Sequence, residues 1–396
     1  MDKLQKLISS MKVSLANHEK ELDQRFNDDT AKHKKLVEDA IAFDVRKYEE
    51  EMKQKKAKEE DEKNKKQLLE AKKKAQAEKK AQLELEQKKL SSNKGGASST
   101  GLEEYNKHMA AIENYKKNIK PKLEDPAFRK QCFEARRLIK RTIIQLQFKH
   151  NVILEKYQIL RDHILNVKNQ SIDAFHVLLN HVGKTLLLQV RQEVDGAPFS
   201  AYFLAKLAVL LAGSIPEFKD YLYGRLLKRC PYLVPNYFDY DSTLSHDEIK
   251  KLLHYQYDED KKEFQSFLQY APKQRCYVMF FAAMITTVPG AGHPANPFSI
   301  GLGWTWCARI MNMSQREITP TLIHAFLEIA GNRMVQAYPR QFPKVLRLLY
   351  DQVIPTTPIH PNKDNVSAIS VLKMYLEDYF NTGNMVPIPE IMKANV

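Results

Sequence analysis

The feature that most constrains the fold is the start of the chain, because residues 1–90 contain neither proline nor glycine. This segment holds 24 Lys and Arg against 20 Asp and Glu. Glu–Lys pairs four residues apart on a helix each contribute about 0.2–0.5 kcal/mol. We therefore predict one long, solvated helix. A partly disordered charged tail is the alternative that this composition also permits.

Apolar residues recur only in the first part of this segment. They are spaced by three, four or seven residues, which is the spacing of a coiled-coil stripe: Leu4, Leu7, Met11, Leu15, Leu22 and Phe26. We expect self-association through this part of the arm. The arm is followed by the Gly/Ser-rich stretch SSNKGGASSTG, residues 91–101, which is typical of a flexible linker. The predicted domains are an arm at 1–90, a linker at 91–101 and a globular domain at 102–396.

The globular domain is expected to be all-α. Its helical segments have wide apolar faces, and we predict that they stack in antiparallel pairs as a HEAT-like α-solenoid. Asp125 before Pro126 and Ser171 have the residue types of N-caps. Gly213 is expected to end one helix, and Ser214 to cap the next.

The second half of the domain carries further helical patterns. No alternating apolar and polar run bounded by turn residues indicates a sheet anywhere in the globular domain. Helices are expected near 258–286, 297–312, 319–333, 340–353 and 366–381.

Several classes of function lack their sequence signatures. The chain has no phosphate-binding GxxxxGK[ST] loop, no HExxH and no GxSxG. No apolar run is long enough to span a membrane, and the N-terminus has no signal-peptide core. The four cysteines are scattered, which predicts reduced core thiols in an intracellular protein: Cys132, Cys230, Cys276 and Cys307. We expect neither an enzyme nor a metal site.

The formal net charge of +14 indicates an anionic partner. Residues 101–190 hold 16 Lys and Arg against 9 Asp and Glu, so the one-sided excess lies early in the globular domain. A basic helix there has two interpretations, a solvated face or a surface for nucleic-acid phosphates. Its cations are Arg129, Lys130, Arg136, Arg137, Lys140, Arg141 and Lys149.

A second basic group ends the helix in YLYGRLLKRCPYL, where Arg225, Lys228 and Arg229 precede a Cys-Pro pair. Cations near a helix C-terminus interact favourably with the helix dipole, by about 0.3–1 kcal/mol each. The other interpretation is a polyphosphate site, in which cations from separate helices converge on one ligand. The candidates for convergence are Lys184, Lys206 and the cluster from Arg137 to Arg141.

Three blocks of sequence resemble the Gle-one family, the nucleoporins that mediate poly(A) RNA export. The first is PFSAYFLAKLAVLLAGSIPEFKDYLYGRLLKRCPYLVP, the second PFSIGLGWTWCARIMN and the third VQAYPRQFPKVLRLL. They occur in the family's order, and weaker similarity covers about residues 130–390. We expect the two tryptophans of the second block, Trp304 and Trp306, to be core residues and not ligand contacts.

The resemblance implies an mRNA export factor at the cytoplasmic face of the nuclear pore complex, in the nuclear envelope and the adjoining cytoplasm. Members bind and stimulate the DEAD-box ATPase of mRNA export, with inositol hexakisphosphate bridging the two proteins. Other nucleoporins are further partners, and RNA is contacted indirectly. The charged arm of this chain is similar in kind to the family's coiled-coil arm.

The resemblance also implies where the ligand binds. The family's basic element falls on Arg225, Lys228 and Arg229, and an ungapped alignment places another pocket lysine on Lys184. The next pocket position of the family falls on Leu188, which departs from the family by being apolar.

A contribution from the first basic helix fits Arg137, Lys140 or Arg141. The alternative function is an RNA-binding or coiled-coil scaffold without an ATPase-activating role.

Overall fold

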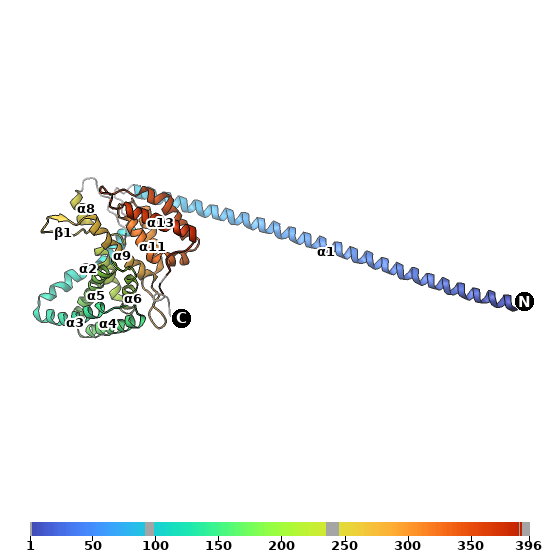
Figure 1. Cartoon of the computed structure of the whole chain (residues 1–396), viewed down its shortest axis with the longest axis horizontal. Coiled ribbons are helices and arrows are strands. Elements are labelled where there is room, and N and C mark those ends of the chain that lie inside the picture. Colours follow the sequence, from blue (N-terminus) through green and yellow to red (C-terminus); the bar gives the residue numbers. More distant parts are fainter. Residues whose placement is uncertain (1, 92–98, 235–244, 388, 390–396) are drawn as a thin grey trace. The chain divides into compact units, whose positions relative to one another are not determined.

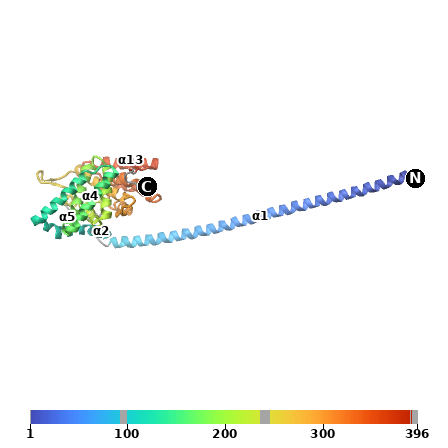
Figure 2. The ribbon, with the colours of Figure 1, turned by 90° about the horizontal axis from the view of Figure 1, so that it is seen from below.

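A computed structural model describes residues 2–91, 99–234, 245–387 and 389. The chain divides into two compact units, Met1–Asn93 and Lys94–Val396. The first unit consists of one continuous helix, α1 (Asp2–Ser91), which both ribbon views show as a single rod (Figures 1 and 2). The prediction of a long N-terminal helix is confirmed.

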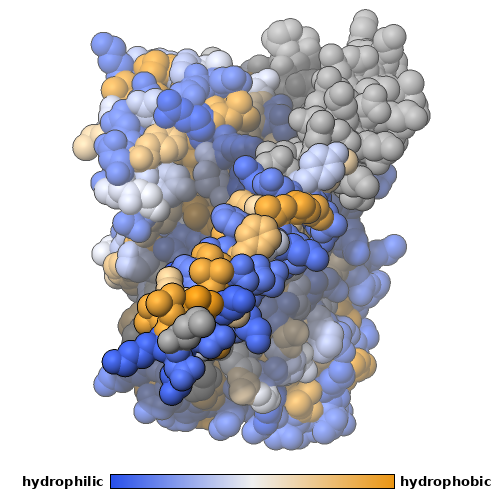
Figure 3. Space-filling model, turned by 90° about the vertical axis from the view of Figure 1, so that its right-hand side faces the viewer, coloured by the Kyte–Doolittle hydropathy of each residue, from blue (hydrophilic) through white to orange (hydrophobic). Residues whose placement is uncertain are grey.

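The apolar stripe of α1 is open to solvent. Leu4, Leu7, Met11 and Leu15 are all more than half exposed, and so are Leu22 and Phe26. Figure 3 shows hydrophobic residues exposed between hydrophilic ones. Pairing of this stripe with another helix stays a prediction. The linker prediction also stays a prediction, because residues 92–98 lie outside the described residues and the next helix begins at Ser99.

The second unit is built almost entirely of helices, which confirms the all-α prediction (Figure 1). After α2 come a π-helical turn (Tyr115–Ile119) and a 3-10 turn (Lys120–Glu124), and after α12 come a second π-helical turn (Leu349–Val353) and a second 3-10 turn (Ile354–Thr356). The α-helices are α2 (Ser99–Asn114), α3 (Pro126–Ile144), α4 (His150–Gln170), α5 (Ile172–Glu193), α6 (Ser200–Ser214), α7 (Pro216–Arg229), α8 (His246–Leu252), α9 (Phe267–Thr286), α10 (Ile300–Asn312), α11 (Thr319–Ala337), α12 (Phe342–Leu348) and α13 (Val366–Thr382).

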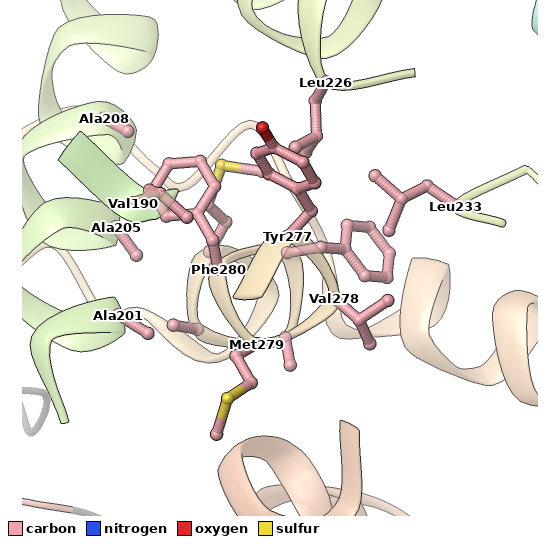
Figure 4. Packing of buried hydrophobic residues seen from close by; sticks show 14 of the residues in the cluster. Val190, Ala201, Ala205, Ala208, Leu226, Leu233, Tyr277, Val278, Met279 and Phe280 are labelled. Atoms are coloured by element: carbon pink, nitrogen blue, oxygen red, sulfur yellow. The ribbon is translucent and has the colours of Figure 1, made fainter. Parts of the chain in front are cut away.

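Helix α9 forms the centre of the core and packs against α5, α6 and α11. Figure 4 views this packing from close by, with Phe280 on the side of Val190 and Tyr277 on the side of Leu226. Ala201, Ala205 and Ala208 of α6 lie on the side of α9, and their small side chains allow the two helices to approach closely (Figure 4). Around this centre, α3, α4, α5 and α6 pack on one another, and α7 packs on α5 and α2.

Two of the predicted helix boundaries are confirmed by hydrogen bonds. The Asp125 carboxylate accepts a hydrogen bond from the Phe128 N–H at 2.9 Å, and the Ser171 hydroxyl accepts one from the Ala174 N–H at 3.2 Å. These are the N-caps of α3 and α5.

The boundary predicted at Gly213 and Ser214 is wrong, because α6 continues through both residues. Ser214 does not cap α7 but shares a hydrogen bond with the Tyr157 hydroxyl at 2.6 Å. A Cβ added to Gly213 would lie 3.2 Å from Cβ of Pro294. Glycine at this position therefore serves close packing against Pro294 and not helix termination.

The prediction of a helix from residue 258 is also wrong over its first part, because these residues form a β-hairpin. Strands β1 (Tyr257–Asp258) and β2 (Glu263–Phe264) pair antiparallel, with Tyr257 opposite Phe264. The Asp258 carboxylate accepts hydrogen bonds from two backbone N–H groups of the turn, at 3.1 and 3.2 Å. A short acidic side chain competes with helix formation in this way. Helix α9 then begins at Phe267 after a capping box at Ser266.

The prediction of core tryptophans is confirmed for Trp306, which is buried. The Trp306 indole N–H donates to the Tyr232 carbonyl oxygen at 2.9 Å, and its ring stacks on Phe326 at 4.6 Å between centroids. Trp304 is partly buried against Tyr338. The four cysteines are buried and unpaired, as expected. None of the helices in the described part of the chain is long and apolar enough to cross a membrane.

Candidate anion-binding site

A cavity of about 900 Å³ opens between α5, α7, α9 and residues 245–266. We call residues 245–266, which comprise α8 and the β-hairpin, the strap. Two acidic residues, Asp247 and Glu259, lie on the cavity wall. Of the described residues, seven lysines and arginines line the cavity: Lys184, Arg191, Arg225, Lys228, Arg229, Lys251 and Lys273. The balance of charge suits an anion.

The four cations predicted to converge lie on this one cavity. Arg225, Lys228 and Arg229 are spaced by three and four residues, which places them on one face of α7. Lys184 comes from α5, which packs against α7. The cations therefore reach the cavity from two separate helices. A favourable helix dipole at the end of α7 does not account for Lys184.

Arg225 is the buried member of this group, with 8% of its surface exposed. Its Nε donates a hydrogen bond to Oδ1 of Asn180 at 2.6 Å, and its guanidinium carbon lies 5.9 Å from the centre of the Tyr115 ring. Burial lowers the pKa of Arg225, and the charge of Arg229 acts in the same direction. The guanidinium is thus held in place by neutral partners.

Lys184 shows how strongly the cations repel one another. The cavity wall withdraws its ammonium from water, and the charges of nearby cations add to this effect, so that the pKa of Lys184 is lowered to about 8. These cations are Arg225, Arg136, Lys228 and Arg229. Its side chain still reaches solvent.

Lys228 is affected in the same way, because burial lowers its pKa and the neighbouring Lys116, Arg225 and Arg229 lower it further. Among the residues that the structure describes, none of Lys184, Arg225, Lys228 and Arg229 forms an ion pair with a carboxylate. Proteins normally pair charges that are brought together and withdrawn from water. A bound anion would supply the missing negative charge.

The strap is fixed to α9 by aromatic stacking and hydrogen bonds. The Tyr255 ring stacks on Tyr270 at 3.6 Å, and the Tyr270 hydroxyl donates to the Leu253 carbonyl oxygen at 2.7 Å. The ammonium of Lys273 donates to Oε1 of Gln256 at 2.9 Å and to Oε1 of Gln265 at 2.6 Å. One wall of the cavity is therefore held in position.

Sequence reasoning missed three of the cavity cations. Arg191 follows Lys184 by seven residues, two helical turns on the same face of α5, and this spacing is visible in the sequence. Lys251 carried no such signal, because no helix was predicted at its position. Lys273 carried none either, because it reaches the cavity wall through contacts to the strap, where a helix was expected from residue 258. Leu188 lines the cavity between Lys184 and Arg191.

The three candidates on α3 do not line this cavity. Arg137, Lys140 and Arg141 lie along a second depression of about 500 Å³, together with Phe133 and His181, among others. Burial lowers the pKa of His181 to about 4, and the charges of Arg136, Lys184 and Lys140 contribute. The two sites therefore lie within electrostatic reach of each other. A shared ligand contact by Arg137, Lys140 or Arg141 stays a prediction.

The proposed convergence of Lys206 is wrong. This lysine is fully buried in α6, where its ammonium donates a hydrogen bond to the Val288 carbonyl oxygen. Burial lowers the pKa of Lys206. It ties α6 to the loop after α9 and does not reach the cavity.

No group of three or more His, Cys, Asp or Glu among the described residues is arranged to hold a metal ion.

Comparisons with known proteins agree on one family. The model of the family described as GLE1-like protein matches residues 110–350. The chain is 27% identical over 205 residues to the mRNA export factor GLE1 of Rattus norvegicus, covering 51% of this chain and 29% of that protein. It is 30% identical over 171 residues to the factor of Danio rerio, covering 42% and 24%. With the Schizosaccharomyces pombe factor it shares 25% identity over 239 residues, covering 58% and 47%. The matches span less than half the length of these relatives.

Two solved structures contain a similar chain. Both are of a variant Saccharomyces cerevisiae Dbp5 C-terminal domain bound to Gle1 and IP6. The TM-scores are 0.66 and 0.65, at 22% and 20% identity, and each match covers 74% of this chain and 98% of that one. At this identity the likeness establishes a shared fold.

Proposed function

The chain belongs to the GLE1-like protein family, and from that premise we propose that it is a non-enzymatic mRNA export factor. It acts at the cytoplasmic face of the nuclear pore complex, alongside other nucleoporins. Its partner is the DEAD-box ATPase of mRNA export, which it binds and stimulates. The curated relatives are named as mRNA export factors, which supports the proposal.

The ligand in this proposal is inositol hexakisphosphate, bound in the cavity between α5, α7 and α9. The observation that carries it is the convergence of Lys184, Arg225, Lys228 and Arg229 without a carboxylate partner among the described residues. Lysine and arginine form strong, charge-assisted hydrogen bonds to phosphate. The presence of IP6 in the solved complexes of similar fold supports the same ligand.

The ligand couples the two proteins. Cations of this chain and of the ATPase face the same polyphosphate, so that each protein raises the affinity of the other for it. The helical domain contacts the two RecA-like lobes of the ATPase and favours a more open arrangement, which accelerates release of RNA or nucleotide. RNA is therefore handled by the ATPase and contacted by this chain only indirectly.

The test is ATPase stimulation by the full chain, with purified partner and RNA, with and without inositol hexakisphosphate. We expect the double variant Lys228→Glu/Arg229→Glu to lose the ligand-dependent part of the stimulation, because repulsion replaces two phosphate contacts. A control with the same change in net charge is Lys344→Glu/Lys373→Glu, since neither residue lines the cavity. Unchanged ligand dependence in the first double variant would contradict the site assignment.

A second candidate function, direct RNA binding, is favoured by one observation. The exposed Phe133 ring lies in the depression on α3 with Arg136, Arg137 and Lys140. Cations beside an exposed aromatic ring are a common means of binding single-stranded nucleic acid. Binding of RNA by residues 102–396, measured over a range of salt concentrations, distinguishes the two. Tight binding at physiological salt with a steep salt dependence would favour this second function.

A further inference from the structure

The far wall of the cavity carries a second pair of cations, Arg191 on α5 and Lys273 on α9. Arg191 follows Lys184 by seven residues, which is about 10.5 Å along the helix axis at 1.5 Å per residue. The apolar Leu187 and Leu188 lie on the wall between them. The cavity thus has one group of cations at the end of α7 and another beside the strap.

The position of Lys273 is fixed by neutral groups. Its ammonium donates to the side-chain carbonyl oxygens of Gln256 and Gln265, which leaves its charge without compensation. Neither Lys273 nor Arg191 forms an ion pair within the residues that the structure describes. Burial lowers the pKa of Lys273, and Arg191 is the charge that adds to this effect.

Tyr277 of α9 lies between the two groups. Burial raises its pKa, while the charges of Arg229 and Arg191 both act in the opposite direction. Arg229 belongs to the first group and Arg191 to the second. The phenol also lines the cavity, so its O–H is available to an anion that reaches from one group to the other.

We propose that Arg191, Lys273 and Tyr277 form a second phosphate subsite of the same cavity. The inference rests on the proposed function, because it assigns further phosphates of the same inositol hexakisphosphate to this second subsite. A ligand that fills both subsites carries phosphates on opposite sides of its ring. The cavity therefore selects fully phosphorylated inositols over those phosphorylated on one side.

Calorimetric titration of the full chain without its partner tests this proposal. For inositol hexakisphosphate we expect Arg191→Gln and Lys273→Gln each to lose about tenfold in affinity, the size of one charge-assisted contact. For inositol 1,2,3-trisphosphate, whose three phosphates stand on adjacent ring carbons and therefore fit the four-cation group alone, we expect the same variants to bind like the wild type. Lys250→Gln is the matched control, since Lys250 lies on the strap over the Phe264 ring and does not line the cavity.

The outcomes separate the two proposals. If Lys228→Gln/Arg229→Gln weakens hexakisphosphate binding while Arg191→Gln and Lys273→Gln do not, the second subsite does not exist and the proposed function stands. If none of these variants changes the affinity, the cavity is not the ligand site and both proposals fail. If Arg191→Gln lowers the affinity for inositol hexakisphosphate only when the ATPase is present, Arg191 pairs with an acidic residue of the partner. That result would also overturn the second subsite. Unchanged thermal unfolding of the variants shows that they are folded.

Discussion

Replacing Lys184 by arginine should remove a pH dependence from ligand binding. In the free protein the cavity wall and four cations hold the pKa of Lys184 near 8. A bound polyphosphate places negative charge beside the ammonium and raises its pKa toward the ordinary value. Binding therefore takes up a proton, and affinity falls as pH rises from 7 to 9. Arginine stays charged over this range, so the variant lacks this component.

The magnitude follows from the lowered pKa. With a pKa of about 8, roughly nine-tenths of the Lys184 side chains are protonated at pH 7 and about one-tenth at pH 9. The affinity would then fall by at most about tenfold, or about 1.4 kcal/mol. Solvent reaches Lys184 and screens its interactions, so we expect a fall of about three- to tenfold.

The assay is titration calorimetry with inositol hexakisphosphate at pH 7, 8 and 9, in pairs of buffers that differ in ionisation enthalpy. The phosphates of the ligand titrate in the same way with both proteins. The difference in proton uptake between the wild type and Lys184→Arg therefore reports the protonation of Lys184 alone. At pH 8 the wild type should take up about half a proton more than the variant. Identical proton uptake and parallel pH profiles would refute the electrostatic reasoning.

Three further predictions concern the fold. Lys206→Met should leave ligand affinity within about twofold, because the Lys206 ammonium reaches the Val288 carbonyl and not the cavity, and calorimetry checks this. Trp306→Ala should lower the free energy of unfolding by about 3–5 kcal/mol in a urea titration, because it removes a buried ring stacked on Phe326. Gly224→Ala should cost about 1–3 kcal/mol, since the new Cβ would lie 2.5 Å from a backbone oxygen of α2, whereas Gly196→Ala meets nothing within 4 Å and should change stability by less than about 0.5 kcal/mol.

Helix boundaries were predictable where the sequence carries a local capping signal. Asp125 before Pro126 marks the start of α3, and Ser171 marks that of α5, because each cap depends only on its own turn. Gly213 was misread because its role depends on Pro294, which is distant in sequence. Contacts between distant segments leave no pattern in a short stretch of sequence.

The cavity residues likewise divide into those with a local sequence signal and those placed by contacts between distant segments. Arg225, Lys228 and Arg229 could be proposed from one helix face, and Lys184 from the family resemblance. Lys273 could not, because its place depends on how the strap folds against α9.

The clustered cations of α5 and α7 have a consequence for the stability of the protein. Their mutual repulsion is greatest in the empty domain, so that form is the less stable of the two. Occupancy stabilises the fold in proportion to the logarithm of the ligand concentration. A shortage of the ligand would thereby raise the unfolded fraction of the protein and expose more of it to degradation.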